Sequence, residues 1–512
     1  MMATFNDSRL RLASDRSPNE QGDYVLYWMQ AYRRLDRNHA LDHALYWSRQ
    51  LKKPLVVYEG LRLDYPWASA RHHRLMIDGM MANTLKSKKL GINYWPFVET
   101  LAQPARGLLR KLSAKACLVV TDDYPAFIVP GQIAALAGKI DVPLHVIDGN
   151  GIVPLKLLGP AVSACAHLRH RIHRLFAEAW QHRAVAEPVF SKVARQQIDA
   201  PFELCTPHAP HEEYVASLPI DQSVKPVPGV VGGSDAGKTA LKAFLRDKLP
   251  RYGEARNQPD DPARSAASGL STYLRYGHLS IQEVAENVLS SAGEWSVDQI
   301  NFASRGKRDG FFHTDPNVNG FLDEAITWRD VGYHWHFVRN AERGPRRMEW
   351  KSLDGVKCPS FQDLESTLPA WALASLQKHA SDKREHVYTL AQWEAGATHD
   401  PLWNAAQREL VATGRIHNYM RMLWGKKVLE WSASPEEAYL ILEHLNNKYA
   451  LDGRDPNSYT GILWCFGLFD RPWPPERKVF GNVRYMSSEN TARKFKLAGY
   501  YEYVKRLDQY ND

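Results

Sequence analysis

Cysteine is scarce in this chain of 512 residues: there are five, widely spaced and odd in number. They are Cys117, Cys165, Cys205, Cys358 and Cys465. This pattern argues against a disulfide scaffold and indicates a reducing compartment. A run of about 18 apolar residues is also missing, so we expect no membrane span. Residues 1–20 include Asp7, Asp15 and Glu20, unlike a secretory signal or a transit peptide, and we expect a cytoplasmic protein.

Internal repeats and low-complexity tracts are missing as well, and the composition is that of a globular protein, with 44% hydrophobic and 24% charged residues. The net charge of +8 is a weak indication of a polyanionic partner. Tryptophan is abundant, with 16 residues. Ten of them lie in the C-terminal part: Trp328, Trp335, Trp350, Trp371, Trp393, Trp403, Trp424, Trp431, Trp464 and Trp473. Such a group is typical of a large aromatic core or of a site for a flat ring.

Short apolar runs alternate with helix-period segments in the first 150 residues. The runs, at 24–28, 54–58, 117–120 and 144–147, have the length and composition of buried strands. Helical periodicity covers 40–51, 70–90 and about 132–138. Strands separated by helices are typical of βαβ units, so we predict a Rossmann-like α/β domain with a parallel sheet over residues 1–200. The loop at 148–151 follows the last strand, where such sheets often hold ligands.

Residues 201–239 differ from the sequence on either side, because proline, glycine and serine are frequent and periodicity is weak. We predict an inter-domain connection here, lying over the surface of the protein. Helical periodicity dominates from residue 240 and predicts an all-helical domain over residues 240–512. Ser434, which precedes a proline and two glutamates, is typical of a helix N-cap.

Two motifs in the chain have chemical interpretations that we reject. Residues 232–239 match the phosphate-loop pattern Gly-x4-Gly-Lys-Thr, but residues 224–231 contain two prolines and do not form the strand that such a loop must leave. His167, His170 and His173 alternate with arginines, which repel a metal cation. A capped helix start and a solvated basic helix face explain these segments, and we expect no metal site.

One helix is predicted over residues 414–431. Trp424 and Trp431 are seven residues apart in it, so they share a face and lie about 10 Å apart along the axis. Two indoles at this spacing are suited to pass electrons from one to the other. Apolar core stripes have the same spacing, and periodicity alone favours the core.

Several stretches resemble the photolyase/cryptochrome family, and within it the class II photolyases for cyclobutane pyrimidine dimers. They are Tyr27-Trp-Met-Gln30, Asn150-Gly-Ile-Val-Pro154, Ser268-Gly-Leu-Ser271-Thr-Tyr-Leu-Arg-Tyr-Gly277-His-Leu-Ser280, Phe321-Leu-Asp-Glu324-Ala, Thr398-His-Asp-Pro-Leu-Trp403-Asn-Ala-Ala-Gln407, Leu451-Asp452-Gly-Arg-Asp-Pro-Asn457 and Phe480-Gly-Asn-Val-Arg484-Tyr-Met. The resemblance extends over nearly the whole chain. It implies an N-terminal α/β domain and an all-helical C-terminal domain that binds FAD.

In this family the reduced flavin absorbs blue light and passes an electron to the dimer, whose cyclobutane ring then splits. The resemblance therefore implies a lyase that repairs UV-damaged DNA, with the dimer flipped out of the helix. It leaves open a second antenna chromophore of the deazaflavin or folate type. We expect a monomer, associated with the nucleoid in a prokaryote. A cryptochrome-like photoreceptor, a photolyase for another lesion and a non-enzymatic nucleic-acid binder are the alternatives.

The resemblance also implies roles for single residues. Glu324 corresponds to the carboxyl group that hydrogen-bonds the dimer, and Trp328 and Trp464 to the walls that pack on it. Asn446 corresponds to the asparagine beside flavin N5. Electron transfer is assigned to Trp424, Trp403 and Trp431, in this order outward. The residues assigned to FAD are Tyr252, Ser268, Gly269, Leu270, Ser271, Arg329, Asn418, Arg421, Asp452 and Arg454. Those assigned to DNA phosphates are Arg471, Arg477, Lys478 and Arg484.

The sequence departs from the class II pattern in several places. Asn447 follows Asn446 where these proteins usually carry aspartate. Asn418 takes the place of a glycine, and Arg275 that of a histidine. A stretch around residues 348–362 has no obvious counterpart. These departures predict that the chain belongs to a divergent subgroup of the class II proteins.

Overall fold

The computed structural model describes residues 7–208 and 211–508. They group into two compact units. Unit 1 comprises the described residues up to Ala161 together with Leu168–Ala243 and Gly269–Pro345. Unit 2 comprises Val162–His167, Phe244–Ser268 and the described residues from Arg346 onward. The segment Gly269–Pro345, which the sequence assigns to the helical domain, therefore packs with the α/β part of the chain.

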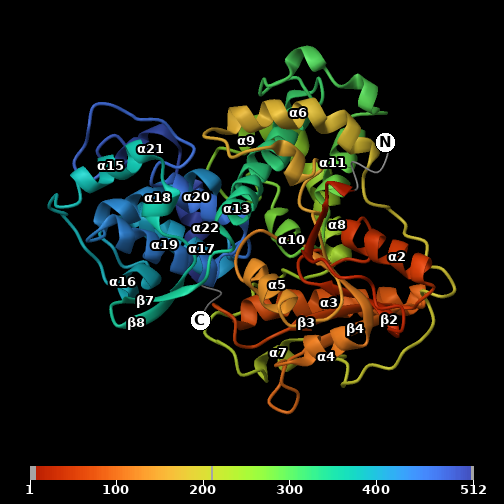
Figure 1. Cartoon of the computed structure of the whole chain (residues 1–512). Coiled ribbons are helices and arrows are strands. Elements are labelled where there is room, and N and C mark those ends of the chain that lie inside the picture. Colours follow the sequence, from red (N-terminus) through yellow and green to blue (C-terminus); the bar gives the residue numbers. More distant parts are fainter. Residues whose placement is uncertain (1–6, 209–210, 509–512) are drawn as a thin grey trace. The chain divides into compact units, whose positions relative to one another are not determined.

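Unit 1 is built on a six-stranded sheet, whose strands are coloured red to orange in Figure 1. The strands are β1 (Leu10–Ser14), β2 (Tyr24–Met29), β3 (Leu55–Leu61), β4 (Asn93–Val98), β5 (Ala116–Asp122) and β6 (Leu144–Ile147). Their order is β1-β6-β5-β2-β3-β4, and β1 alone of these strands pairs antiparallel. The predicted parallel sheet is confirmed, with β1 and β4 as edge strands that the sequence reading did not include.

Four helices connect the strands of this sheet: α2 (His39–Leu51), α3 (Ala70–Leu90), α4 (Leu108–Ala114) and α5 (Val129–Ala137). Asn38 starts α2, because its side chain accepts hydrogen bonds from the backbone N–H groups of Ala40 and Leu41. Gly91 ends α3 in the left-handed region, at φ 69°. The central strands are buried on both faces, as expected for a sheet between helices.

The remaining elements that lie wholly or mainly in unit 1 are helical. They are η1 (Leu155–Leu158), α6 (Cys165–Gln181), α7 (Glu212–Ala216), α8 (Ser234–Asp247), α10 (Ser271–Arg275), α11 (Ile281–Ser290), η3 (Val297–Gln299), η4 (Phe302–Ser304), α12 (Pro316–Leu322), the π-helix η5 (Asp323–Trp328) and α13 (Arg329–Arg343). The predicted connection lies along α3, where the carbonyls of Asp221 and Val224 accept from the N–H groups of Ala70 and Arg71. Lys238 of the rejected phosphate-loop motif lies 3.1 Å from the Asp36 carboxylate, so its charge already has a partner.

Unit 2 is almost entirely helical. Its elements are η2 (Leu249–Arg251), α9 (Tyr252–Ala255), β7 (Glu349–Leu353), β8 (Val356–Ser360), α14 (Leu364–Thr367), α15 (Ala370–Lys378), α16 (Leu390–Ala395), α17 (Pro401–Thr413), α18 (Asn418–Trp431), α19 (Pro435–Tyr449), α20 (Pro456–Trp464), α21 (Ser488–Lys494) and α22 (Ala498–Asp508). Ser434 caps α19 as predicted, by accepting from the Glu437 N–H.

The predicted helix over 414–431 is wrong in its first turn. Gly414 has φ 67° and ends α17, and α18 begins only at Asn418. The extra stretch near residue 350 also departs from the helical pattern, because β7 and β8 form a two-stranded antiparallel hairpin. In the part of the chain that the structure describes, no helix combines the length and apolar character needed to cross a bilayer.

Candidate functional site

A buried array of tryptophans forms the centre of unit 2. Trp424 of α18 and Trp403 of α17 are nearly parallel, with ring centres 6.3 Å apart and an interplanar angle of 8°. The Trp403 indole N–H donates to the Trp424 carbonyl at 3.0 Å, and the Trp424 indole N–H donates to the buried amide of Gln407 at 3.0 Å. These bonds satisfy both indoles inside the core and fix the orientation of the two rings.

A fourth ring, Trp393 of α16, connects Trp403 to Trp431. Its centre lies 4.8 Å from Trp403, and 6.2 Å from Trp431 with the planes 12° apart. All four indoles are at most 4% exposed. The sequence reading omitted Trp393 because Gly396 and the following turn separate it from α17, so it shares no helical phase with Trp403. The high number of tryptophans in this part of the sequence indicated an aromatic cluster. Their spacing along the chain could not show which rings are neighbours in the array.

Arg421 lies one turn before Trp424 on α18 and anchors a polar cluster. Its Nη1 lies 3.1 Å from Asp452 Oδ1, and its Nη2 donates to the side-chain oxygen of Asn446 and, at 3.4 Å, to Ser458. The Asn446 amide donates to Ser458 Oγ at 2.6 Å and to Asn447 Oδ1 at 3.2 Å. The structure thus brings three predicted cofactor-side residues, Arg421, Asp452 and Asn446, into one hydrogen-bonded group.

Asn447, one of the departures, is fully buried and holds the turn that carries Asp452. Its Oδ1 accepts from the Arg454 backbone N–H at 2.7 Å, and its Nδ2 donates to the Tyr459 hydroxyl at 3.3 Å. Arg454 has φ 63°, a conformation that a side chain tolerates only where neighbouring contacts fix it. An amide supplies both a donor and an acceptor here, whereas an ionised aspartate has no donor for Tyr459.

The other predicted cofactor residues lie on separate segments. Tyr252 is buried, with the Arg256 guanidinium 5.3 Å from its ring centre. Gly269 has φ 71° in the Ser268–Ser271 loop, and Ser271 is the exposed first residue of α10. Asn418 is exposed at the start of α18. The Arg275 guanidinium lies 5.6 Å from the ring centre of Tyr124.

Glu324 and Trp328 lie on the π-helix η5 of unit 1. They are four residues apart and therefore project from the same side. Trp328 is 40% exposed, a large apolar area left in contact with solvent. Glu324 Oε1 lies 3.8 Å from the Arg308 guanidinium, and its side chain is 29% exposed. Single π-helical turns often mark functional sites, and here the turn presents a carboxylate and an indole together.

Arginines and tryptophans alternate near the end of α20 in unit 2. The Arg484 guanidinium lies 5.7 Å from the ring centre of Trp464 and 4.7 Å from that of Trp473. Arg471 lies 4.6 Å from the Trp473 ring centre, and Trp473 is 37% exposed. Three of the four predicted phosphate contacts, Arg471, Arg477 and Lys478, are exposed, and Arg484 is half-buried. Cations beside exposed aromatic rings are the chemistry that single-stranded or flipped nucleotides use.

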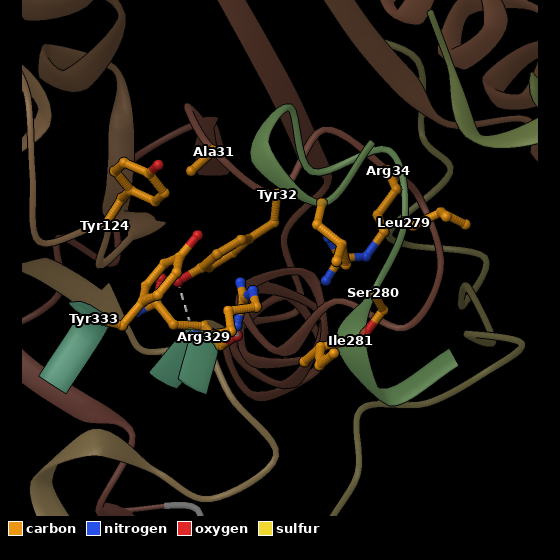
Figure 2. Close-up of a pocket in the computed structure, with 12 residues that line it drawn as sticks. Ala31, Tyr32, Arg34, Tyr124, Leu279, Ser280, Ile281, Arg329 and Tyr333 are labelled. Atoms are coloured by element: carbon orange, nitrogen blue, oxygen red, sulfur yellow. Dashed lines mark hydrogen bonds between the residues drawn. The ribbon is translucent and has the colours of Figure 1, made fainter. Parts of the chain in front are cut away.

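A small pocket opens at the carboxyl ends of β2, β5 and β6 within unit 1. Figure 2 shows Tyr32, Tyr333 and Arg329 together on one side of it, and Arg34 with Ser280 on the other. Arg329 donates to the Asn150 carbonyl at 2.8 Å and lies 4.1 Å from the Tyr333 ring centre. These side chains leave room for about one water molecule. A ring-sized ligand at this edge would have to displace Arg329 or Tyr333.

Asp330, next to Arg329, is buried behind this pocket. Burial raises the pKa of its carboxyl to about 7, partly offset by Arg329 at 3.0 Å. Clusters of three or more metal-ligating side chains do not occur in the described ranges 7–208 and 211–508.

The chain is similar over its length to several known proteins. A deoxyribodipyrimidine photo-lyase of Methanothermobacter thermautotrophicus is 33% identical over 500 residues, which cover 98% of this chain and 98% of the relative. The chain belongs to the photolyase/cryptochrome family. Deoxyribodipyrimidine photo-lyases of Potorous tridactylus and Arabidopsis thaliana are each 30% identical, over 98% and 94% of this chain and 86% and 89% of their own length. No family model matches the chain.

Solved structures of the photolyase/cryptochrome family share the fold. A class III photolyase from Agrobacterium tumefaciens has a TM-score of 0.56 at 17% identity, covering 96% of this chain and 88% of that one. A cryptochrome from Synechocystis has a TM-score of 0.58 at 16% identity, covering 94% and 88%. The predicted fold class, an α/β sheet domain followed by a helical part, is confirmed.

The photolyase/cryptochrome family implies an FAD cofactor, and the residues of unit 2 fit it. The Arg421 cluster combines a guanidinium, a carboxylate and an amide, which is the donor and acceptor set that a flavin ring requires. Arg421 and Trp424 are three residues apart on α18, so a ring bound at Arg421 would lie beside the inner end of the tryptophan array.

Proposed function

We propose that this chain is a deoxyribodipyrimidine photo-lyase, a light-driven lyase that splits cyclobutane pyrimidine dimers in UV-damaged DNA with electrons from FAD. The observation that carries the proposal is the full-length identity of 33% to a lyase of that name. Two local arrangements support it. The first is the buried tryptophan array that begins beside Arg421, and the second is the pair formed by the half-buried Glu324 and the exposed Trp328.

FAD, when bound, supplies the light absorption and the electron. Around it, Arg421 would favour negative charge on the reduced ring, and Asp452 would hold the guanidinium in place at 3.1 Å. Asn446 would contact the ring at N5, although both hydrogens of its amide are engaged by Ser458 and Asn447. The Asn446 oxygen, which accepts from Arg421 and has a second lone pair, is the atom that would accept from a cofactor N–H.

We propose that Glu324 and Trp328, which lie together on η5, contact the substrate; for Trp464 of unit 2 the same role rests on the resemblance alone. A flipped dimer presents carbonyl oxygens and base faces, which match the carboxyl group of Glu324 and the indole of Trp328. Stacking of a base on an indole contributes about 1–3 kcal/mol. Trp328 leaves 40% of its surface exposed for such a contact.

We also propose the class II subgroup, on the sequence stretches around residues 398–407 and 451–457, and a monomer that acts in the cytoplasm or on the nucleoid. The net charge of +8 and the exposed Arg471, Arg477 and Lys478 support a DNA partner. A second chromophore is not part of the proposal.

The decisive experiment is blue-light repair of an oligonucleotide that contains one cyclobutane dimer, with the reduced holoprotein and a dark control. We expect light-dependent loss of the dimer, and a large decrease in repair yield for Glu324→Gln with FAD still bound. Glu342→Gln, at an exposed glutamate of α13, is the matched control and should repair normally. Intact dimers with a normally photoreduced flavin would refute the lyase in favour of a photoreceptor or another lesion.

A further inference from the structure

The histidine- and arginine-rich face of α6, predicted to be solvated, holds two segments of unit 1 in place. Arg169 is buried and forms a bidentate contact with Asp323, the first residue of η5. One turn later the buried His173 accepts at Nδ1 from the Gly306 backbone N–H at 3.1 Å. Burial and the nearby Arg169 lower the pKa of His173 to about 3, so this ring is neutral and can accept. One turn of α6 therefore holds both η5 and the loop that precedes α12.

Residues 301–310 of this loop, which we call the basic loop, are fixed a second time by the buried Asn319 of α12. The Asn319 side-chain oxygen accepts from the backbone N–H groups of Phe311 and Phe312, each at 3.0 Å, and its amide donates to the Arg308 carbonyl at 3.0 Å. α12 continues directly into η5, and the loop lies beside α6 (Figure 1). The backbone at Arg308 is therefore held at a fixed place relative to η5.

Three cations of the basic loop are exposed beside Glu324. Arg308 lies 3.8 Å from Glu324 Oε1, and the two side chains are 58% and 29% exposed, so this pair is a weak one. Arg305 and Lys307 are exposed as well, and neither forms an ion pair with any residue that the structure describes. The loop carries a single carboxylate, that of Asp309. Its net positive charge, held next to Glu324, attracts a polyanion.

We infer that the basic loop binds phosphates of the DNA strand that carries the dimer, and that Arg308 exchanges Glu324 for a phosphate when this strand binds. The inference rests on the proposed function, since it takes Glu324 as the residue that meets the flipped base. A nucleotide whose base reaches Glu324 brings its own phosphates to the cations beside that carboxylate. A guanidinium binds phosphate through paired charge-assisted hydrogen bonds, whereas its 3.8 Å contact with Glu324 is too long for one. The exchange leaves Glu324 Oε1 to the edge of the base.

Dark binding of a labelled oligonucleotide to the holoprotein, over a series of salt concentrations, tests the phosphate contact. With one cyclobutane dimer in the oligonucleotide, Arg308→Gln should weaken binding about tenfold at low salt. It should also reduce the steepness of log affinity against log salt concentration by about one, and Lys307→Gln should reduce this steepness too. Arg110→Gln, at an exposed arginine of α4, is the matched control and should bind like the wild type. A steepness in Arg308→Gln equal to that of the wild type overturns the proposal.

An undamaged oligonucleotide, which presents phosphates without a flipped dimer, tests the exchange with Glu324. Glu324→Gln removes the competing carboxylate, so it should raise the affinity about threefold. The gain should be clearly smaller when Arg308→Gln is present in the same chain, because the cation that Glu324 held is then missing. Asp309→Asn removes a neighbouring exposed carboxylate and measures the general effect of one negative charge, which should not depend on Arg308. An equal gain from Glu324→Gln with and without Arg308 overturns the exchange.

Light separates this inference from the proposed function, because the binding experiments are done in the dark and need no electron transfer. If the wild type repairs dimers and Arg308→Gln keeps the wild-type steepness, the basic loop is refuted and the lyase stands. If the steepness changes as expected and dimers stay intact under blue light, the lyase is refuted and the phosphate contact stands. A wild type without salt-dependent DNA binding overturns both. Flavin absorbance and far-UV circular dichroism verify that each variant is folded with FAD bound.

Discussion

The pair formed by Arg169 and Asp323 supports the π-helix that presents Glu324 and Trp328. Arg169 Nε lies 2.7 Å from Asp323 Oδ1, and Nη2 lies 3.0 Å from Oδ2, so the contact is bidentate. The two side chains are 8% and 1% exposed. Asp323 is the first residue of η5, directly before Glu324. Removing Arg169 therefore leaves the buried Asp323 carboxylate without this counterion, next to the predicted substrate residues.

We predict that Arg169→Met or Asp323→Leu alone lowers the free energy of unfolding by about 3–5 kcal/mol, the usual cost of an uncompensated buried charge. The double variant Arg169→Met/Asp323→Leu should recover most of this loss, because no charge is then left behind. Arg174→Met, at an exposed arginine of the same helix α6, is the matched control and should change stability by at most about 0.5 kcal/mol.

Urea unfolding followed by far-UV circular dichroism and by tryptophan fluorescence measures these differences. Two probes are needed because a chain with two compact units need not unfold in one step, and coincident curves are the test. Two results would refute this prediction. One is a loss of unfolding free energy below about 1 kcal/mol for Arg169→Met. The other is a loss in the double variant that equals the sum of the losses in the two single variants. Either result would mean that water reaches the pair in the folded protein.

Two further results are expected. Burial raises the pKa of the Glu443 carboxyl from 4.5 to about 8, so the folded state holds this proton while the unfolded state releases it, and stability falls as pH rises through that window. Glu443→Gln should remove about 4 kcal/mol of this pH dependence, measured as the difference in unfolding free energy between pH 5 and pH 9, and an unchanged slope would contradict it. For DNA binding, Arg477→Ala should reduce the steepness of log affinity plotted against log salt concentration by about one. Arg246→Ala, at an exposed arginine paired with Asp247, is the control and should leave this slope unchanged. Equal slopes for both variants would exclude a phosphate contact of Arg477.

The sequence predicted the elements whose pattern is local and regular. Residues 70–90 were read as a helix and form α3, since Ser69 and Gly91 bound a continuous helical period. β4 is not among the predicted strands; it contains Pro96, which is unfavourable in a central strand, and the structure places it at the sheet edge, where proline is tolerated. The hairpin of β7 and β8 could have been predicted from the sequence, because Asp354 and Gly355 form the Asp-Gly turn that favours a hairpin. Their φ angles are 50° and 81°.

The candidate site was only partly accessible from the sequence. Arg421, Asp452 and Asn446 could be named from the resemblance, and the structure brings them together. Trp393 could not, because its contacts with Trp403 and Trp431 join helices whose relative packing no local periodicity encodes. Cap residues, turns and strand composition are local properties, whereas the order of rings in an array is set by tertiary packing.

The proline-rich connection has a bearing on how the chain can be divided. It is hydrogen-bonded along its length within unit 1: the Cys205 N–H donates to the Pro96 carbonyl, and the Gly232 N–H donates to Asp78 Oδ2 at 3.1 Å. α8 follows it and stays in unit 1 up to Ala243. A protease that cuts this connection would therefore nick a folded unit rather than release a domain. A gene divided to express the two halves separately should not be divided here, since both fragments would carry part of one hydrophobic core.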